Sequence, residues 1–328
     1  TSQAIALRRL DAPDGVTLLS RTEARPPLVD AAVFAGSFER NWSVGSFTSL
    51  TRQTGAAPMR AQEETLLEEV PKLSPACTDG APWHRFPRGS VPGNFLHEQL
   101  EWMGNEGFAC VEQANFDTRL AARCERAGWG NRQEDAVAWL RAVATTPLPV
   151  LDAPLSALDG VLPEMEFWFP AECLSSAALD KLCARHLLGD TPRPALPKRE
   201  LHGMLKGFAD LVFEHDERYW VLDYKSNALG AGDGAYHKQA LANGMAAHRY
   251  DIQGAIYMLA LHRLLRSRLG AGYSPEQHLG GALFLFLRGI ANPHTRGCYW
   301  LEARPALLDG LDQLLDEASL PAKESEYE

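Results

Sequence analysis

Two strand-like segments separated by a short charged turn constrain this chain more than any other feature. Met204–Phe213 (MLKGFADLVF) and Tyr219–Lys225 (YWVLDYK) are rich in aromatic and branched apolar residues, and Glu214–Arg218 lies between them. This pattern predicts an antiparallel β-hairpin. We expect its turn to be centred between Asp216 and Glu217.

This register places two acidic residues, Asp210 and Asp223, opposite each other on neighbouring strands. Opposing side chains lie roughly 5 Å apart, so at an effective dielectric of about 20 their repulsion is on the order of 3 kcal/mol. A divalent cation between the carboxylates would reverse the sign of that interaction. Lys225 lies two residues after Asp223 on the same strand face. A cation there can help to deprotonate a metal-bound water, or it can stabilise charge developing on a phosphate. The pattern favours metal-assisted hydrolysis of a phosphodiester.

An exposed hairpin with ordinary surface charges is the alternative interpretation, because Asp-x-Lys alone is a weak signal. The residues around the three charges are apolar: Leu211, Val212, Phe213, Val221 and Leu222. Apolar neighbours predict burial, and buried charges need a partner or a metal. We therefore expect a functional site here.

The rest of the chain predicts an α/β protein. Helical patterns are expected over residues 93–103, 109–127, 133–144, 175–188 and 305–315, and from Ala246 or Tyr250 to Leu269. Met165–Phe169 predicts a strand, and the apolar run Gly281–Leu287 predicts a strand buried on both faces. Trp42–Leu50 is typical of a strand or turn that enters a helix, and Gln62–Pro87 of an exposed acidic loop.

Composition excludes several classes of protein. The chain has 328 residues and no apolar run long enough to cross a membrane. Its six cysteines form no C-x-x-C pair, so neither a zinc site nor an iron–sulfur cluster is expected. The net charge of -10 argues against a protein coated with basic residues, although a local basic groove would still be compatible with it.

Five ordered stretches resemble the RecB-family branch of the PD-(D/E)XK nucleases. They are FPRGSVPGNFLH (Phe86–His97), EMEFWFP (Glu164–Pro170), GFADLVFEHDERYWVLDYKSN (Gly207–Asn227), HRYDIQGAIYMLALHR (His248–Arg263) and GGALFLFLRG (Gly280–Gly289). The resemblance covers roughly Trp42 to Trp300. It implies a restriction-endonuclease-like core, with a mixed sheet flanked by helices and an α-rich N-terminal section.

The resemblance implies a metal site and assigns its ligands. His97, Asp210 and Asp223 resemble the metal-binding side chains of the family, and the backbone carbonyl of Tyr224 is similarly placed. The implied ion is Mg²⁺, as one or two ions, with Ca²⁺ or Mn²⁺ able to substitute, and no iron–sulfur cluster is implied. Without the surrounding motif, His97 would be read as a solvated histidine on an amphipathic helix.

The same resemblance assigns further catalytic residues. Lys225 resembles the catalytic lysine, and Gln253 and Tyr257 match a Q-x-x-x-Y motif whose spacing puts both on one helical face. Glu166 resembles the active-site glutamate of the family, with Glu164 on the same strand face as the alternative. Glu166 facing solvent from an edge strand is a rival interpretation, as is simple helix packing for Gln253 and Tyr257.

The function implied is that of a deoxyribonuclease acting on single-stranded, unwound DNA during double-strand-break repair by recombination. The implied partners are a RecB helicase motor, RecC-like and RecD-like subunits and RecA recombinase, in the bacterial cytoplasm and without a membrane. A docking module that recruits RecA, with weak or occluded cleavage, is the alternative function.

The implied domain organisation places a motor before the nuclease. The chain has no G-x-x-x-x-G-K-[ST] motif, so the motor itself is not expected within it. Residues 1–25 are expected to be the remnant of the preceding helicase region, 26–45 a linker, 46–317 the nuclease domain and 318–328 a disordered acidic tail. The acidic loop Gln62–Pro75 is a candidate cover for the cleft.

Overall fold

The fold is built around one mixed β-sheet. The structure, a computed structural model, describes residues 15, 42–51 and 80–316, without the side chains of residues 172 and 173. In this part of the chain the sheet has six strands: β1 (Trp42–Gly45), β2 (Leu162–Ser175), β3 (Glu200–His215), β4 (Arg218–Lys225), β5 (Leu279–Phe286) and β6 (Cys298–Leu301).

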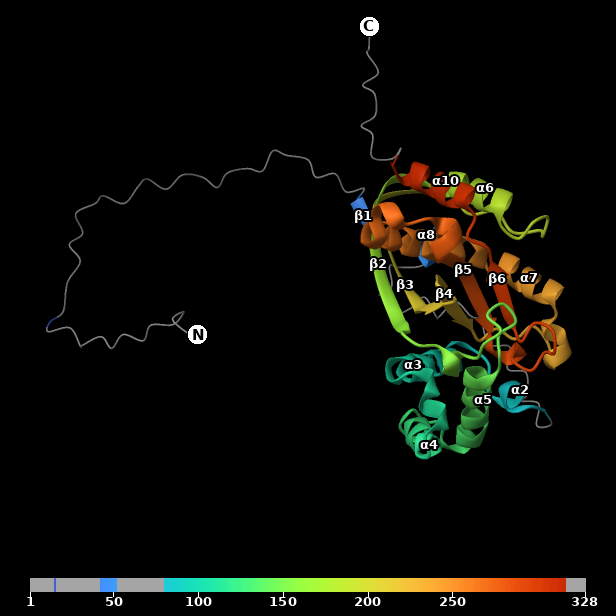
Figure 1. The fold of residues 1–328 in the computed structure, drawn as a ribbon. Helices are drawn as coiled ribbons and strands as arrows, with labels where there is room; N and C mark the ends of the chain where they lie inside the picture. The colour runs from blue at the N-terminus through green and yellow to red at the C-terminus, as the bar shows by residue number, and fades with distance from the viewer. Residues whose placement is uncertain (1–14, 16–41, 52–79, 317–328) are drawn as a thin grey trace, which may run out of the picture. The chain divides into compact units, whose positions relative to one another are not determined.

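The longest strand, β3, organises the sheet. β2 runs antiparallel along one edge of β3 and forms the outer strand on that side (Figure 1). The other edge of β3 is shared, because β1 pairs in parallel with residues 202–205 and β4 pairs antiparallel with residues 211–215. β5 then pairs in parallel with β4, and β6 antiparallel with β5. The edge of β3 between β1 and β4 therefore has no strand partner among the described residues.

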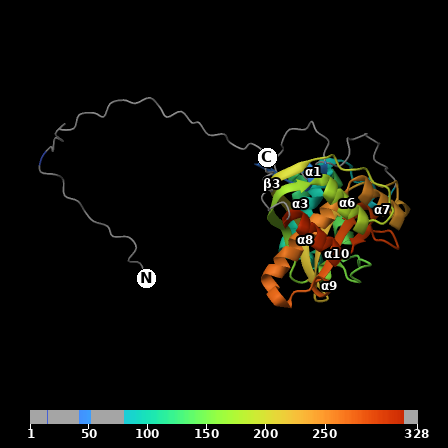
Figure 2. The same ribbon diagram turned by 90° about the horizontal axis from the view of Figure 1, so that it is seen from above.

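Helices cover the sheet in two layers (Figures 1 and 2). The core on one side includes α6 (Ser176–His186), α7 (Lys238–Ala247), α8 (Tyr250–Leu269) and α10 (Pro305–Asp316). The core on the other side includes α3 (Ser90–Glu106), α4 (Phe116–Arg126) and α5 (Gln133–Thr145). Shorter helices are α1 (Phe47–Thr51), α2 (Pro82–Arg85) and α9 (Pro275–His278).

The strand β5 shows why the sheet needs both layers. All of its residues are buried. Phe284 and Phe286 belong to the core under α8, whereas Leu283 and Leu285 belong to the core under α3 and α5. Alternate side chains thus supply apolar area to opposite cores. The predicted strand buried on both faces is confirmed.

The hairpin register is confirmed, except that the strands part before its predicted pair of Asp210 with Asp223. Leu211 pairs with Leu222, and the register runs without a shift to His215 and Arg218. Asp216 and Glu217 form the two-residue turn with φ values of 50° and 60°. Two central residues with positive φ are typical of a type I′ turn, whose twist matches that of the two strands.

Two sequence-based boundaries need correction. The predicted linker 26–45 extends too far, because Trp42–Gly45 pairs with β3 as a strand. Ser46 then caps α1, accepting a hydrogen bond from the Ser49 amide at 3.4 Å. The predicted loop Gln62–Pro87 is wrong at its end, where α2 forms and Phe86 is buried. Apolar packing of Phe86 overrides the polar composition around it.

Other expectations lie outside the described residues. These are the helicase remnant 1–25, most of the linker, the acidic cover Gln62–Pro75 and the tail 318–328. In the described residues, no helix is both long and apolar enough to span a membrane.

Candidate active site

The site lies where β3 and β4 part. Their last paired residues are Leu211 and Leu222, after which β4 continues to Lys225 paired only with β5 among the described residues. The Tyr224 amide, released from the β3 ladder, donates a hydrogen bond to Asp210 Oδ2 at 2.7 Å. A carboxylate therefore takes the place of a backbone acceptor at the opening between the strands.

His97 reaches the same carboxylate from the helical layer. It lies on α3, with Nδ1 3.5 Å from Asp210 Oδ2, and both side chains are 16% exposed. Its ring meets the Tyr224 ring edge-on, with centroids 5.9 Å apart. The partial exposure of His97 and Asp210 leaves this side of the site accessible to solvent.

Arg288 fixes the segment that leads into α3. Its buried guanidinium donates to the carbonyls of Trp83, Phe86 and Pro87. It also donates to the carbonyl of Ser226, the residue after Lys225, at 3.0 Å. One side chain thus ties the approach to α3 to the end of β4, and so sets His97 relative to the acidic strand.

A second group of contacts joins β4 to α8. Lys225 Nζ lies 2.6 Å from Asp223 Oδ2 and donates to Gln253 Oε1 at 3.0 Å. Gln253 Nε2 donates to Asp223 Oδ1 at 2.9 Å and to the Tyr257 hydroxyl at 2.8 Å. The structure brings these four predicted residues together, and all of them are buried. The amide of Gln253 holds both ends of the Asp–Lys pair in place.

Aromatic rings complete the surroundings of the lysine. Lys225 Nζ lies 3.9 Å from the centre of the Tyr250 ring, within the range of a cation–π contact. The Tyr250 hydroxyl donates to Asn227 Oδ1 at 3.2 Å. Tyr250 stacks on Phe284 of β5, with ring centroids 5.8 Å apart. The ammonium group is therefore held in one position by a carboxylate, an amide and a ring.

The two aspartates respond differently to burial. Burial, and then the charge of Asp210, raise the pKa of Asp223 to about 7 against the opposing effect of Lys225. Burial also acts to raise the pKa of Asp210, but His97, Lys225 and the Tyr224 amide outweigh it and the pKa is lowered. Of the two carboxyl groups, the surroundings therefore favour the ionised form of Asp210, whereas burial and the charge of Asp210 favour the protonated form of Asp223.

The structure separates the two candidate glutamates. Removal from water, and then the charge of Asp210, raise the pKa of Glu164 to about 8, with His97 and Asp223 also acting on it. Glu166 instead lies at the surface, with Oε1 2.7 Å from Lys206 Nζ and accepting from Trp168 Nε1 at 3.0 Å. Glu164 therefore shares the electrostatics of the site, and Glu166 is not brought together with it.

The donor set suits a hard divalent cation by type and by charge. Asp210, Asp223 and the Tyr224 carbonyl offer the oxygen atoms that Mg²⁺ and Mn²⁺ prefer, and His97 adds a nitrogen. Burial, and then the charge of Asp210, raise the pKa of Asp223, and a cation beside its carboxylate would oppose both effects. Within residues 42–51 and 80–316, no three acidic, histidine or cysteine side chains are close enough to enclose an ion as they stand. The fit therefore rests on donor chemistry and charge.

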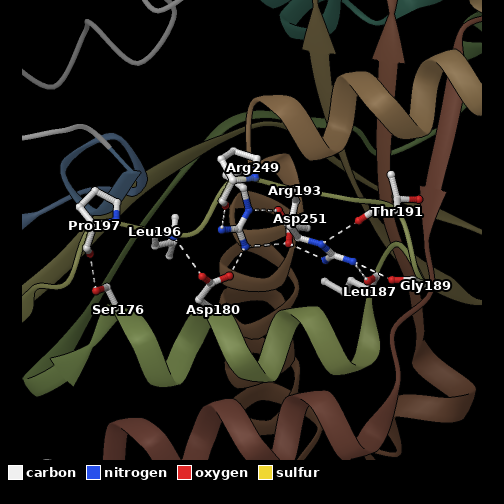
Figure 3. A network of polar contacts seen from close by, with 11 residues as sticks. Ser176, Asp180, Leu187, Gly189, Thr191, Arg193, Leu196, Pro197, Arg249 and Asp251 are labelled. Carbon is white, nitrogen blue, oxygen red and sulfur yellow. Dashed lines mark hydrogen bonds and ion pairs between the residues drawn. The ribbon is translucent and has the colours of Figure 1, made fainter.

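A buried charge network holds Arg249, the residue just before α8 and four residues before Gln253 (Figure 3). Arg249 has φ 57° and donates through two nitrogens to Asp251, at 3.0 and 3.1 Å. Asp251 also accepts from Arg193 at 3.0 Å, and Asp180 on α6 accepts from Arg249 at 2.6 Å. This network fixes both the position and the rotation of the first turn of α8.

A glycine allows α8 to approach the sheet. A Cβ on Gly254 would lie 2.6 Å from Leu301 Cδ1 and 3.0 Å from the Phe284 ring. No larger residue fits there without moving β5, β6 or the helix. The close approach brings Gln253 within reach of Asp223 and Lys225.

Sequence reasoning missed the residues that position the site. Tyr250 and Asp251 lie inside the motif HRYDIQ, and Arg288 lies inside GGALFLFLRG. A charged residue within a buried apolar run was the available signal, because such a charge needs a buried partner. The partners themselves lie far away in the sequence, and no local pattern names them.

Comparison with known proteins gives one consistent result. Residues 77–324 match the PD-(D/E)XK nuclease superfamily. The chain is similar to RecBCD enzyme subunit RecB from Escherichia coli K12, with 37% identity over 84% of this chain and 23% of that protein. The same subunit from Mycolicibacterium smegmatis is 28% identical, over 90% of this chain and 31% of the relative. The chain thus spans about a quarter to a third of the length of these relatives.

Proposed function

Because this chain belongs to the PD-(D/E)XK nuclease superfamily, in its RecB branch, we propose that it hydrolyses single-stranded DNA with Mg²⁺ as its ion. Nucleases of this superfamily generally use divalent metal ions. The observation that carries the proposal is the acid-rich cluster at the parting of β3 and β4, with a lysine fixed beside it. These intact residues favour hydrolysis over a role in docking alone.

His97, Asp210, Asp223 and the Tyr224 carbonyl would hold the ion. When bound, a divalent ion supplies an activated water and offsets charge on the phosphate. Asp210 remains ionised through His97 and the Tyr224 amide. A bound cation would offset the burial and the charge of Asp210 that raise the pKa of Asp223, so binding of the ion would be coupled to release of its proton.

Lys225 acts as a fixed cation in this proposal. Burial acts to lower its pKa, but Asp223 and Tyr250 outweigh burial and raise it, so the ammonium form persists. A permanently protonated lysine stabilises charge on the attacking oxygen and on the phosphate, and does not accept a proton. Gln253 donates and accepts hydrogen bonds that position the lysine, and Tyr257 holds Gln253. Glu164, whose pKa burial raises to about 8, would supply the proton to the leaving oxygen in this proposal.

The substrate and partners extend the proposal to the assembled enzyme. The relatives are subunits of a RecBCD enzyme by name, and we place this chain beside a RecB motor and RecC-like and RecD-like subunits in the bacterial cytoplasm. DNA unwound by the motor would then be the strand that reaches the site.

The test is degradation of a single-stranded oligonucleotide by this chain with Mg²⁺, with EDTA, and after Asp223→Ala. The matched control is Asp309→Ala, since Asp309 is an exposed aspartate on α10. We expect cleavage that needs Mg²⁺, survives in the control and is lost in Asp223→Ala. Cleavage that persists in Asp223→Ala would contradict the proposed site.

A further inference from the structure

One face of the β1–β3–β2 part of the sheet is open. Even-numbered residues of β3 from 202 to 210 are partly exposed, whereas the odd-numbered residues between them are buried. The register puts Trp42 of β1 beside His202, Trp168 of β2 beside Lys206, and Glu166 of β2 beside Phe208. Since directly paired residues share a face, these side chains form one continuous surface, here called the open face.

The open face carries unusually exposed apolar side chains. Trp42 is 64% exposed, Val44 48% and Trp168 48%. Large apolar residues gathered on one exposed surface mark a binding site more often than chance placement does. The kind of ligand that would bind here is indicated by the charged side chain that lies between these aromatic rings.

Lys206 gives the open face its chemistry. Its Nζ lies 4.4 Å from the centre of the Trp168 ring and 4.8 Å from that of Phe208. It also lies 2.7 Å from Glu166 Oε1, a contact at the surface that solvent weakens. A cation between exposed rings offers both a contact for a phosphate and platforms on which bases stack, which is how single-stranded nucleic acid is bound. Duplex DNA hides its bases and gains nothing from these rings.

The open face runs directly into the active site. Its next row along β3 is Asp210. Because Pro163 pairs with Leu211 and Met165 with Ala209, Glu164 lies on β2 at the level of Asp210. From Met204 to Asp210 the strand covers about 20 Å, the length of a few nucleotides. We propose that this surface is the track along which single-stranded DNA reaches the site, with bases stacked on Trp168 and Trp42 and a phosphate on Lys206. The proposal rests on the nuclease function and names the path of its substrate.

Glu166 provides a second test, because its substitution should change DNA affinity in the opposite direction to that of Trp168. Its carboxylate occupies Lys206 and repels phosphate. Removing that charge in Glu166→Gln should therefore strengthen DNA binding, whereas removing a ring in Trp168→Ala should weaken it. A merely structural role for either side chain predicts no gain of affinity.

The experiment measures the Kd of fluorescein-labelled (dT)12 by fluorescence anisotropy, in EDTA at one fixed salt concentration. Trp168→Ala should raise Kd about tenfold, the effect of losing one stacked base. Glu166→Gln should lower Kd about threefold, since one phosphate contact is freed. Trp300→Ala is the matched control, because Trp300 is 43% exposed on β6, at the other edge of the sheet, and should leave Kd within about twofold.

A second measurement covers binding too weak for anisotropy. In Mg²⁺, Trp168→Ala should raise KM for the same oligonucleotide and leave kcat close to that of the parent chain. Unfolding temperatures confirm that each variant is folded. A fall in kcat with KM unchanged would overturn the track.

The outcomes separate the track from the nuclease function. If the parent chain cleaves DNA but Trp168→Ala and Glu166→Gln both bind and cleave like it, the track is wrong and the function stands. If Trp168→Ala weakens binding but the parent chain does not cleave with Mg²⁺, the track stands and the function fails. If another segment or a second copy covers the face, Trp168→Ala leaves Kd unchanged while lowering the unfolding temperature or the molecular mass, which also overturns the track.

Discussion

Two clusters of buried charge meet the N-terminal half of α8, and they differ in how their charges balance. The cluster at the helix start holds Arg249, Arg193, Asp251 and Asp180, two cations with two anions. The cluster one turn further on joins Gln253 to Asp223 and Lys225, with Asp210 and Glu164 in the same electrostatic neighbourhood. Three carboxyl groups there share one lysine and one histidine.

The difference separates a structural cluster from a functional one. Asp251 is fully buried and accepts from both arginines, so no charge is left over for a ligand. In the acidic cluster, burial first and then the charge of Asp210 raise the pKa values of Asp223 and Glu164, so these carboxyl groups are not fully compensated. A protein retains such a cost where a cation or a reaction uses it. Balance therefore predicts a role in folding, and imbalance predicts a role in chemistry.

The substitution Lys225→Ala should have the largest effect, a loss of DNA cleavage. Loss of the fixed ammonium removes charge stabilisation at the phosphate, and we expect a fall in kcat of about 100- to 1,000-fold. Lys181→Ala is the control, because Lys181 is an exposed lysine on α6. Single-turnover cleavage measures the effect, and an unchanged rate in Lys225→Ala would remove the lysine from the mechanism.

Asp251→Asn should break the balanced cluster. The substitution keeps the shape of the side chain but leaves Arg193 and Arg249 without their shared anion, at a cost of about 3–5 kcal/mol in the free energy of unfolding. In metal-free buffer at pH 7, Asp223→Asn should lower the free energy of unfolding far less. The pKa of Asp223 is about 7, so its side chain is already partly neutral at that pH. Urea unfolding of both variants compares them, and equal losses would show that the two clusters do not differ in kind.

Glu164→Gln and Glu166→Gln sharpen the boundary of the acidic cluster. The charge of Asp210 acts on Glu164. Because Glu164→Gln removes a proton donor, we expect this variant to lose about 100-fold in kcat. Glu166 is paired with Lys206 at the surface, so its substitution should leave kcat within about threefold. The pH profile of kcat gives a second measure, since its limb near pH 8 should disappear in Glu164→Gln alone. The reverse pattern would restore the assignment made from the sequence resemblance.

A third cluster, near the C-terminal half of α8, gives the smallest effect. Burial acts to raise the pKa of Asp312 on α10, but hydrogen bonds from His262, Arg263 and Arg266 outweigh it and hold the pKa well below its usual range. The native state thus binds fewer protons than the unfolded chain, so this stability is present above about pH 4 and is lost as pH falls. Asp312→Asn should cost about 2 kcal/mol at pH 7, and the gap from the parent chain should shrink towards pH 3. A gap independent of pH would show that the charge of Asp312 contributes nothing.

Local chemistry explains which parts of the site could be predicted. The two-residue turn at Asp216 and Glu217 fixed the hairpin register, because each strand alternates strictly between the two faces. That register was enough to bring Asp210 near Asp223 and Lys225. The family motifs added His97 and Gln253, and the structure places both in contact with these residues.

Other features depend on backbone geometry and on distant partners. A period-two pattern puts Glu164 and Glu166 on one face. In the structure Glu164 has a φ of 50°, a left-handed backbone conformation that the neighbouring residue types do not predict. Likewise Arg288 finds its acceptors some 200 positions earlier in the chain. The four-residue strand β6 was missed because so short a segment has no readable period. Tertiary packing decides such features, and a local pattern does not encode them.

The most direct test of the difference between the clusters is the affinity for Mg²⁺, measured by isothermal titration calorimetry without DNA. We predict that the parent chain and the surface control Asp309→Asn bind Mg²⁺ equally, and that Asp223→Asn weakens binding by more than about tenfold. Binding by the parent chain should also release protons near pH 7, because the pKa of Asp223 lies there. Equal affinity in Asp223→Asn and the parent chain would contradict the account, since the charge imbalance at β3 and β4 would then not be what the cation binds.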